Sequence, residues 1–177
     1  MVQHRRAEGL SAEVSAEMIA KHFGLNTSIA VEIVKVEKEA LLADELLTFI
    51  ENCSWEEVQE HMACLVRKWE FAENEAVFVG IADNRIVGMT TLMNTDYYPL
   101  PETFPWVSCV FVTEEYRGYR ISEKLISAAN SYARSLGYDK TYIPTPYLGL
   151  YERFGYKYLK EIVNYGGETD HLFVKEL

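Results

Sequence analysis

The sequence contains few of the residues that build disulfides and metal sites. Its 177 residues include three cysteines, an odd number without a Cys-x-x-Cys spacing, and four histidines that lie far apart. A disulfide framework needs paired cysteines, and a structural zinc site needs clustered ligands. We therefore expect reduced thiols and no metal. The residues concerned are Cys53, Cys64, Cys109, His4, His22, His61 and His171.

Long hydrophobic runs are also missing. No stretch approaches the roughly 20 consecutive apolar residues that a membrane-spanning helix requires. The N-terminal segment carries Arg5, Arg6 and Glu8 and has no apolar core of the kind found in a signal peptide. These two absences predict a cytoplasmic protein that does not bind membranes.

Positive charge is scarce. The chain has 17 lysines and arginines against 27 acidic residues, a formal net charge of −10, and its basic residues are scattered. A nucleic-acid backbone would be repelled over most of such a surface, so we expect no nucleic-acid partner. The acidity suits a cationic substrate such as an amine, although it equally suits a protein that is merely soluble.

The apolar content is sufficient for one buried core. Hydrophobic residues make up 49% of the chain and aromatic residues 13%, as expected of one domain. We predict a helical extension at 1–28, with a helix at 11–23, and a single domain at 29–177. Within the domain we expect strands at 29–36, 76–82, 85–92, 106–113, 141–143, 156–163 and 172–175, and helices at 39–50, 54–69, 118–136 and 148–154.

This order of elements predicts an α/β fold of the α+β type. We expect a central mixed, mostly antiparallel twisted sheet of about six to seven strands, flanked by helices on both faces. The dipeptide Asp83-Asn84 suits the positive φ angles of a tight hairpin turn. The strand at 106–113 should lie near the middle of the sheet, with a ligand beyond its C-terminal end.

The linker between that strand and the following helix has the composition of an anion site. A helix N-terminus offers free backbone N–H groups, and arginine forks match phosphate oxygens. Alternatively, the glycine makes only a turn and the arginines are solvated. The linker reads Glu115-Tyr116-Arg117-Gly118-Tyr119-Arg120-Ile121-Ser122.

Two motifs extend this reading to a family. The segments Val112-Thr113-Glu114-Glu115-Tyr116-Arg117-Gly118 and Leu150-Tyr151-Glu152-Arg153-Phe154-Gly155-Tyr156 resemble the two central motifs of the GCN5-related N-acetyltransferases (GNAT). The resemblance covers about residues 29–177. It implies an acetyltransferase that uses acetyl-CoA, without a metal, and transfers the acetyl group to a primary amine of a small molecule by direct attack.

The resemblance also implies where the cosubstrate binds. The strand at 106–113 would separate from its neighbour, so that its backbone binds the pantetheine arm. Tyr151 stands where the family places the general acid, although it could also be a core or surface aromatic residue. The implied cofactor-binding residues are Val110, Phe111, Val112, Arg117, Gly118, Tyr119, Arg120, Ile121 and Ser122.

The residues that would complete the site stay open at this point. A base should lie near the thioester, but no spacing selects one acidic residue. The aromatic residues at 97–106 could enclose a cation or simply pack together. Cys109 is disfavoured as a nucleophile because it lies mid-strand among apolar residues. The acidic candidates are Glu73, Glu75, Asp96 and Glu102, and the aromatic ones are Tyr97, Tyr98, Phe104 and Trp106.

Two other functions compete with acetyl transfer. Arg120 and Ser122 occupy positions where the family usually has small residues, which would suit an acyl-CoA-binding sensor without turnover. Residues 20–28 could form the turn of a DNA-binding helix-turn-helix, which would require a second helix from Ile29 onward. That stretch is rich in β-branched residues and favours a strand instead. A homodimer would be unsurprising for either enzyme or sensor.

Overall fold

The computed structural model describes residues 29–177, so the extension at 1–28 and the helix expected at 11–23 lie outside the described residues. The described part alternates strands and helices, as the sequence predicted. The strands are β1 (Glu32–Lys35), β2 (Ala76–Ala82), β3 (Arg85–Met93), β4 (Trp106–Val112), β5 (Lys140–Thr145), β6 (Lys157–Val163) and β7 (Thr169–Glu176). The helices are α2 (Leu41–Glu51), α3 (Glu56–Lys68) and α4 (Ile121–Ser135), with short 3₁₀ helices η1 (Glu114–Tyr116) and η2 (Tyr151–Phe154).

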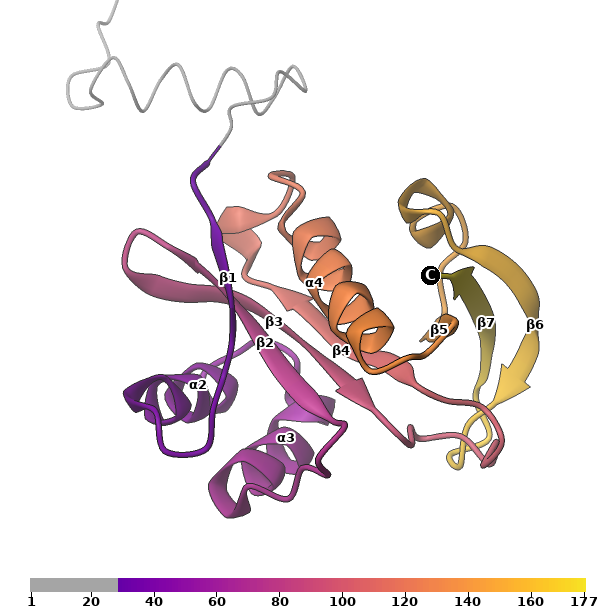
Figure 1. Ribbon diagram of the computed structural model, residues 1–177, viewed down its shortest axis with the longest axis horizontal. Coiled ribbons are helices and arrows are strands. Elements are labelled where there is room, and N and C mark those ends of the chain that lie inside the picture. The colour runs from indigo at the N-terminus through magenta and orange to yellow at the C-terminus, as the bar shows by residue number, and fades with distance from the viewer. Residues whose placement is uncertain (1–28) are drawn as a thin grey trace, which may run out of the picture. The chain divides into compact units, whose positions relative to one another are not determined.

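All seven strands form one sheet in the order β1-β2-β3-β4-β5-β7-β6 (Figure 1). Strands β4 and β5 pair in parallel, and every other neighbouring pair is antiparallel. The structure therefore confirms the mixed, mostly antiparallel sheet. Strand β4 is the fourth of the seven and lies in the middle, as expected.

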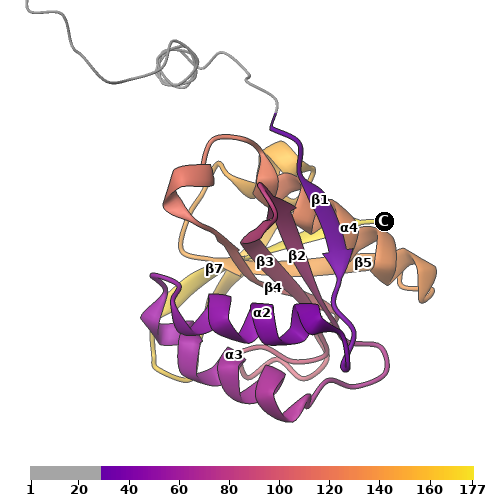
Figure 2. The ribbon, with the colours of Figure 1, turned by 90° about the vertical axis from the view of Figure 1, so that its left-hand side faces the viewer.

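Helices cover both faces of the sheet because side chains alternate along the strands. Val79 and Met89 point toward α2 and α3, which lie together under the sheet in Figure 2. Gly80 and Gly88 face α4 instead: a Cβ atom at either position would meet Ile121 or Leu125 at 3.3 or 3.2 Å. The two glycines thus let α4 lie close to the sheet.

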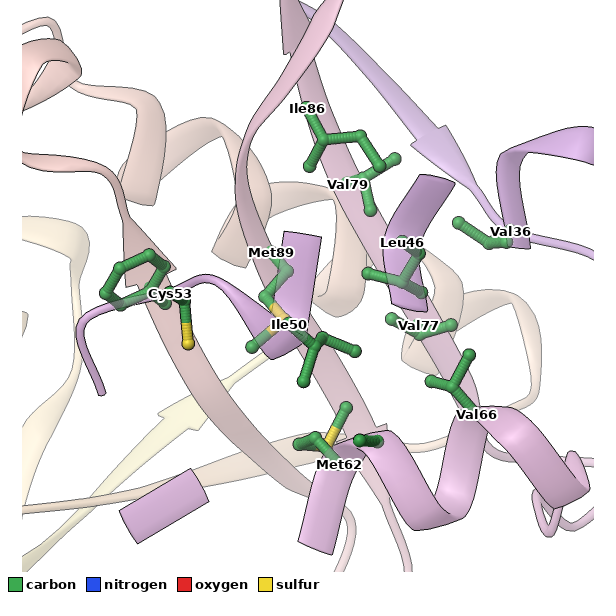
Figure 3. Close-up of a cluster of buried hydrophobic side chains, with 12 residues drawn as sticks. Val36, Leu46, Ile50, Cys53, Met62, Val66, Val77, Val79, Ile86 and Met89 are labelled. Carbon is green, nitrogen blue, oxygen red and sulfur yellow. The ribbon is translucent and has the colours of Figure 1, made fainter. Parts of the chain in front are cut away.

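The larger apolar cluster joins α2 and α3 to the sheet (Figure 3). Leu46 and Ile50 of α2 have no exposed surface, and Met62 of α3 is only 1% exposed. These positions lie on one face of each helix, as the leucine-rich pattern at 39–50 and the apolar stripe of 54–69 predicted. The other faces of both helices carry charged residues.

The predicted hairpin is confirmed. Asp83 and Asn84 connect β2 to β3 with φ angles of 50° and 57°. Both values lie in the left-handed region that a two-residue type I′ turn requires, and that Asp and Asn tolerate better than most residues.

Two helix starts differ from the prediction. Ser54 does not cap α3, whose N-cap position is Trp55; the Ser54 hydroxyl instead donates to a Glu114 carboxylate oxygen at 2.7 Å. Helix α4 begins at Ile121 rather than Gly118, because Gly118 and Arg120 have φ angles of 89° and 59°. A right-handed helix cannot continue through such residues.

The helix-turn-helix alternative fails on the structure. It required a helix from Ile29 onward, and the chain there forms strand β1, which pairs with β2 over Glu32–Lys35. The β-branched composition of this stretch correctly indicated a strand.

Candidate functional site

The central feature of the site is the separation of β4 from β5. These strands share one residue pair, Trp106 with Tyr142, beside a hydrogen bond from the Tyr142 amide to the Pro105 carbonyl at 3.0 Å. From Val107 onward, β4 has no paired residue on β5 among residues 29–177. An extended ligand can bind such a strand edge through backbone hydrogen bonds. Val110, Phe111 and Val112, the predicted pantetheine-binding residues, all lie in this stretch.

A β-bulge bends β4 in the middle of this stretch. The register with β3 shifts between Met89 and Thr91, and Cys109 adopts a φ of 52°. The buried hydroxyls of Thr90 and Thr91 both donate to the Ser108 carbonyl, at 2.9 and 3.2 Å. A bulge re-aims the backbone groups that follow it. No local pattern in the sequence predicts this feature.

The N-terminus of α4 lies just beyond the C-terminal end of β4. Within residues 29–177, no side chain caps this helix end, and a Cβ atom at Gly118 would meet nothing within 4 Å. Uncapped amides together with the positive end of the helix dipole favour an anion. Ile121 is buried, so it could contribute only its backbone amide, whereas Ser122 is partly exposed.

Both arginines of the linker are already paired with carboxylates. Arg117 donates to Glu114 at 2.8 Å and to the Val112 carbonyl at 3.0 Å, and Arg120 donates to both oxygens of Glu123 at 2.5 and 2.8 Å. These pairs are exposed to solvent, where ion pairs contribute little to stability. An arriving phosphate can therefore displace the carboxylates.

The loop that Glu114 occupies is tied to the opposite face of the sheet. The hydrogen bond from Ser54 and, to a smaller extent, the charge of Arg117 lower the pKa of the Glu114 carboxyl. Glu114 thus stays ionised and accepts hydrogen bonds from both Ser54 and Arg117. This contact spans 60 positions in the sequence.

Tyr151 lies in η2 with only 9% of its surface exposed. Its ring is surrounded by those of Phe154, Tyr156 and Phe173, at centroid distances of 6.2, 6.3 and 6.5 Å. Burial raises the pKa of Tyr151 to about 12. The hydroxyl therefore carries its proton at neutral pH and is able to donate it.

The three aromatic residues of the loop before β4 and Trp106 at the start of the strand do not form a cage. Tyr98 stacks on Trp106 at 5.7 Å, and its hydroxyl donates to Asp170 at 2.6 Å. Tyr97 contacts Tyr165 instead, and Phe104 contacts Tyr138. Of the two interpretations, the structure supports packing.

The four acidic residues considered as a base differ in their surroundings. Glu75 accepts hydrogen bonds from the amides of Ala72 and Asn94, both at 2.8 Å, and so holds a turn together. Glu73 and Glu102 are exposed. Asp96 alone reaches β4, where the hydroxyl of Ser108 donates to it. Sequence reasoning missed Ser108, which has no motif around it.

Cys109 is the remaining candidate for side-chain chemistry. Burial raises the pKa of the Cys109 thiol to about 12, so the thiol stays protonated and unreactive. Within residues 29–177, no three His, Cys, Asp or Glu side chains are grouped to hold a metal ion. None of the helices in this range has the length and apolarity to cross a bilayer.

Two comparisons with known proteins bear on the family and on the fold. The model of the acetyltransferase (GNAT) family matches residues 39–156. The crystal structure of aminoglycoside 6'-acetyltransferase type Ii is similar with a TM-score of 0.65 at 19% identity, over 82% of this chain and 96% of that one. An aminoglycoside 6'-N-acetyltransferase complexed with coenzyme A gives 0.64 at 16% identity, over 82% and 96%.

An acetyltransferase from Streptococcus agalactiae gives a TM-score of 0.61 at 18% identity, over 83% of this chain and 98% of that one. At these identities the solved structures establish the fold, while no curated protein matches the sequence. The family model covers both predicted motifs and the elements between them. The resemblance seen in the sequence is thus confirmed, and the chain belongs to the GNAT family of acetyltransferases.

Proposed function

We propose that the protein is an N-acetyltransferase that moves an acetyl group from acetyl-CoA to a primary amine of a small molecule. The observation that carries the proposal is the opening between β4 and β5, which leads to the uncapped N-terminus of α4. The similarity to aminoglycoside acetyltransferases supports a small-molecule acceptor, and the neighbour complexed with coenzyme A supports the cosubstrate.

The residues along this opening fit the parts of acetyl-CoA. The backbone of Val110, Phe111 and Val112 would bind the pantetheine arm as an added strand. The diphosphate would bind the amides at the start of α4 and the guanidinium groups of Arg117 and Arg120. The full set at this end is Arg117, Gly118, Tyr119, Arg120, Ile121 and Ser122.

The chemistry needs no covalent intermediate on the protein. The amine attacks the thioester carbon, and a backbone N–H beside the bulge stabilises the oxyanion, a contribution commonly worth a few kcal/mol. The departing thiolate then accepts a proton from Tyr151. With the tyrosine pKa near 12 and that of a free thiol about 8.5, complete transfer costs about 5 kcal/mol. The same apolar surroundings raise the thiol pKa and reduce this difference.

An acyl-CoA-binding sensor without turnover is the second candidate. It is favoured by Arg120, whose left-handed conformation and ion pair with Glu123 occupy the loop where small residues are usual in the family. Acetyl-CoA binding without acetyl transfer to any amine of a broad panel would select the sensor.

Calorimetric titration with acetyl-CoA tests the common foundation of both candidates. We expect micromolar binding that weakens roughly tenfold or more in Arg117→Ala and in Arg120→Gly, since each loses a charge-assisted phosphate contact. Glycine is chosen at 120 because it adopts the positive φ without strain, so only the guanidinium is lost. Arg67→Ala, which breaks an exposed ion pair with Glu51 on α3, is the matched control. Absence of binding to the wild type would contradict both candidates.

A further inference from the structure

The carboxylate of Asp96 lies against β4 just before the bulge. One oxygen accepts a hydrogen bond from the Ser108 hydroxyl, and the other accepts one from the Tyr97 amide at 2.6 Å. Ser108 directly precedes Cys109, the residue with a φ of 52°. It lies two residues after Trp106, where β4 pairs with β5. Asp96 is thus held at the start of the proposed cofactor opening.

Asp96 approaches this opening from the face opposite α4. Ser108 pairs with Thr91 of β3, which shares a face with Met89 two positions away, and Met89 packs in the cluster with α2 and α3. Cys109 and Phe111 pack into the cluster formed with α2 and α3, whereas Val112 borders Leu125 of α4 beside Gly88. A cofactor anchored at the α4 N-terminus and an acceptor arriving past Asp96 would therefore meet from opposite faces.

The surroundings of Asp96 favour its uncharged form. Burial is the main cause that raises the pKa of its carboxyl, and the charge of Asp170 on β7 adds to the shift. The Ser108 hydroxyl, the Tyr97 amide and His61 of α3 act in the opposite direction but do not cancel it. Burial is the main cause that raises the pKa of the Cys109 thiol and of the Tyr98 hydroxyl, and the nearby Asp96 carboxylate adds to both shifts. A carboxylate in such a site accepts a proton more readily than a solvated one.

We propose that Asp96 is the general base of the transfer reaction, held in position by Ser108, and that the acceptor is a cationic primary amine. This inference rests on the proposed function. Asp170 of β7 adds negative charge beside Asp96, which an ammonium group would seek.

The proton balance is complete with groups that the protein supplies. An N–H bond of the ammonium breaks, and its proton goes to Asp96. The freed lone pair forms the C–N bond as the C=O electron pair moves to oxygen. Collapse of the oxyanion breaks the C–S bond, and the thiolate takes a proton from Tyr151, which recovers one from the new amide nitrogen through solvent. Asp96 releases its proton to water.

Asp96→Asn tests the role without changing the size of the side chain. We expect kcat to fall by about 100-fold or more with a smaller change in KM for the amine, because general-base catalysis typically contributes that much. In the wild type, kcat should fall at acid pH as Asp96 becomes protonated. In the variant this limb should be replaced by one at higher pH, where the bound amine itself loses its proton. Glu102→Gln, an exposed carboxylate of the same loop, is the control.

Stability provides a readout that separates this role from a structural one. A folded-state pKa above the unfolded value means that ionisation of Asp96 destabilises the fold, so its stabilising contribution is lost as pH rises through the folded pKa. Asp96→Asn should therefore melt no lower than the wild type at neutral pH, with unchanged acetyl-CoA affinity. Ser108→Ala should lower kcat and move the acid limb to higher pH, because the Ser108 hydroxyl lowers the pKa of Asp96.

The outcomes distinguish the inference from the function on which it rests. The assay uses acetyl-CoA with an aminoglycoside, a polyamine and a simple alkylamine as acceptors. An active wild type with an equally active Asp96→Asn variant overturns the role of Asp96 alone. A variant whose only defect is a higher KM assigns Asp96 to substrate binding and also overturns the proposal. A wild type that binds acetyl-CoA but acetylates none of the amines overturns both proposals.

Discussion

The Tyr151 hydroxyl shows how a single residue depends on its surroundings. The motif Leu150-Tyr151-Glu152-Arg153-Phe154-Gly155-Tyr156 predicted its position, but the aromatic rings that bury it come from η2, from β7 and from the residue preceding β6. These rings exclude water and raise the pKa of Tyr151 to about 12. A proton donor of this kind stays protonated and neutral over the whole physiological pH range.

Replacing Tyr151 by Phe isolates the hydroxyl. We expect kcat to fall roughly 100-fold while acetyl-CoA affinity is unchanged, because the proton is needed only as the thiolate departs. Steady-state kinetics and calorimetry on the same preparation measure the two effects. Tyr158→Phe, at a half-exposed position of β6, should leave both quantities unchanged. Unchanged turnover in Tyr151→Phe, with chemistry rate-limiting, would remove Tyr151 from the mechanism.

At the scale of elements, the opening depends on how closely β3, β4 and α4 approach one another. Gly88 of β3 pairs with Val112 of β4, and a Cβ atom there would lie 2.7 Å from the Phe111 carbonyl oxygen. Backbone cannot move aside as a side chain can. The same Cβ would also crowd Leu125 of α4 at 3.2 Å. A small residue at 88 is therefore required by tertiary packing.

Gly88→Ala should lower the free energy of unfolding by about 1–3 kcal/mol through overpacking. It should also weaken acetyl-CoA binding, because Phe111 and Val112 belong to the proposed pantetheine edge. Gly80→Ala is the matched control: its Cβ would meet only side-chain atoms, the nearest being Ile121 Cγ2 at 3.3 Å. Urea denaturation and calorimetry compare the two variants. Equal loss at both positions would contradict the importance of the backbone contact.

At the scale of the whole molecule, two helix layers enclose the sheet, and only one of them reaches the proposed anion site. The layer of α2 and α3 contributes a core cluster with β2, β3 and β4. The layer of α4 places its N-terminus beyond β4. Stability and cofactor binding are thus assigned largely to different faces, and mutations can affect them separately.

Leu46→Ala tests this separation. Leu46 has no exposed surface, and its truncation should lower the free energy of unfolding by about 2–5 kcal/mol. Below the unfolding transition, acetyl-CoA affinity should be retained. Leu41→Ala, at an 84% exposed position of the same helix, should change stability by less than about 0.5 kcal/mol. A large loss of affinity in folded Leu46→Ala would show that the two faces are coupled.

The sequence by itself determined the features that depend on near neighbours. The hairpin at Asp83-Asn84, the apolar faces at 39–50 and 54–69 and the strand–linker–helix order at 106–136 follow from turn chemistry and periodicity. The order of the two motifs indicated the family. The position of Arg117 and Arg120 near a helix start was also readable, although Gly118 and Arg120 displaced that start to Ile121.

Tertiary structure alone decided the features that join distant segments. The separation of β4 from β5 arises from how the strands pair, and the bulge at Cys109 from its register against Met89 and Thr91. The Ser54–Glu114 and Asp96–Ser108 contacts likewise have no local pattern, because side chains meet through space. Proximity, burial and the resulting pKa shifts are properties of the packed chain, so the sequence could suggest Asp96 among several carboxylates but could not select it.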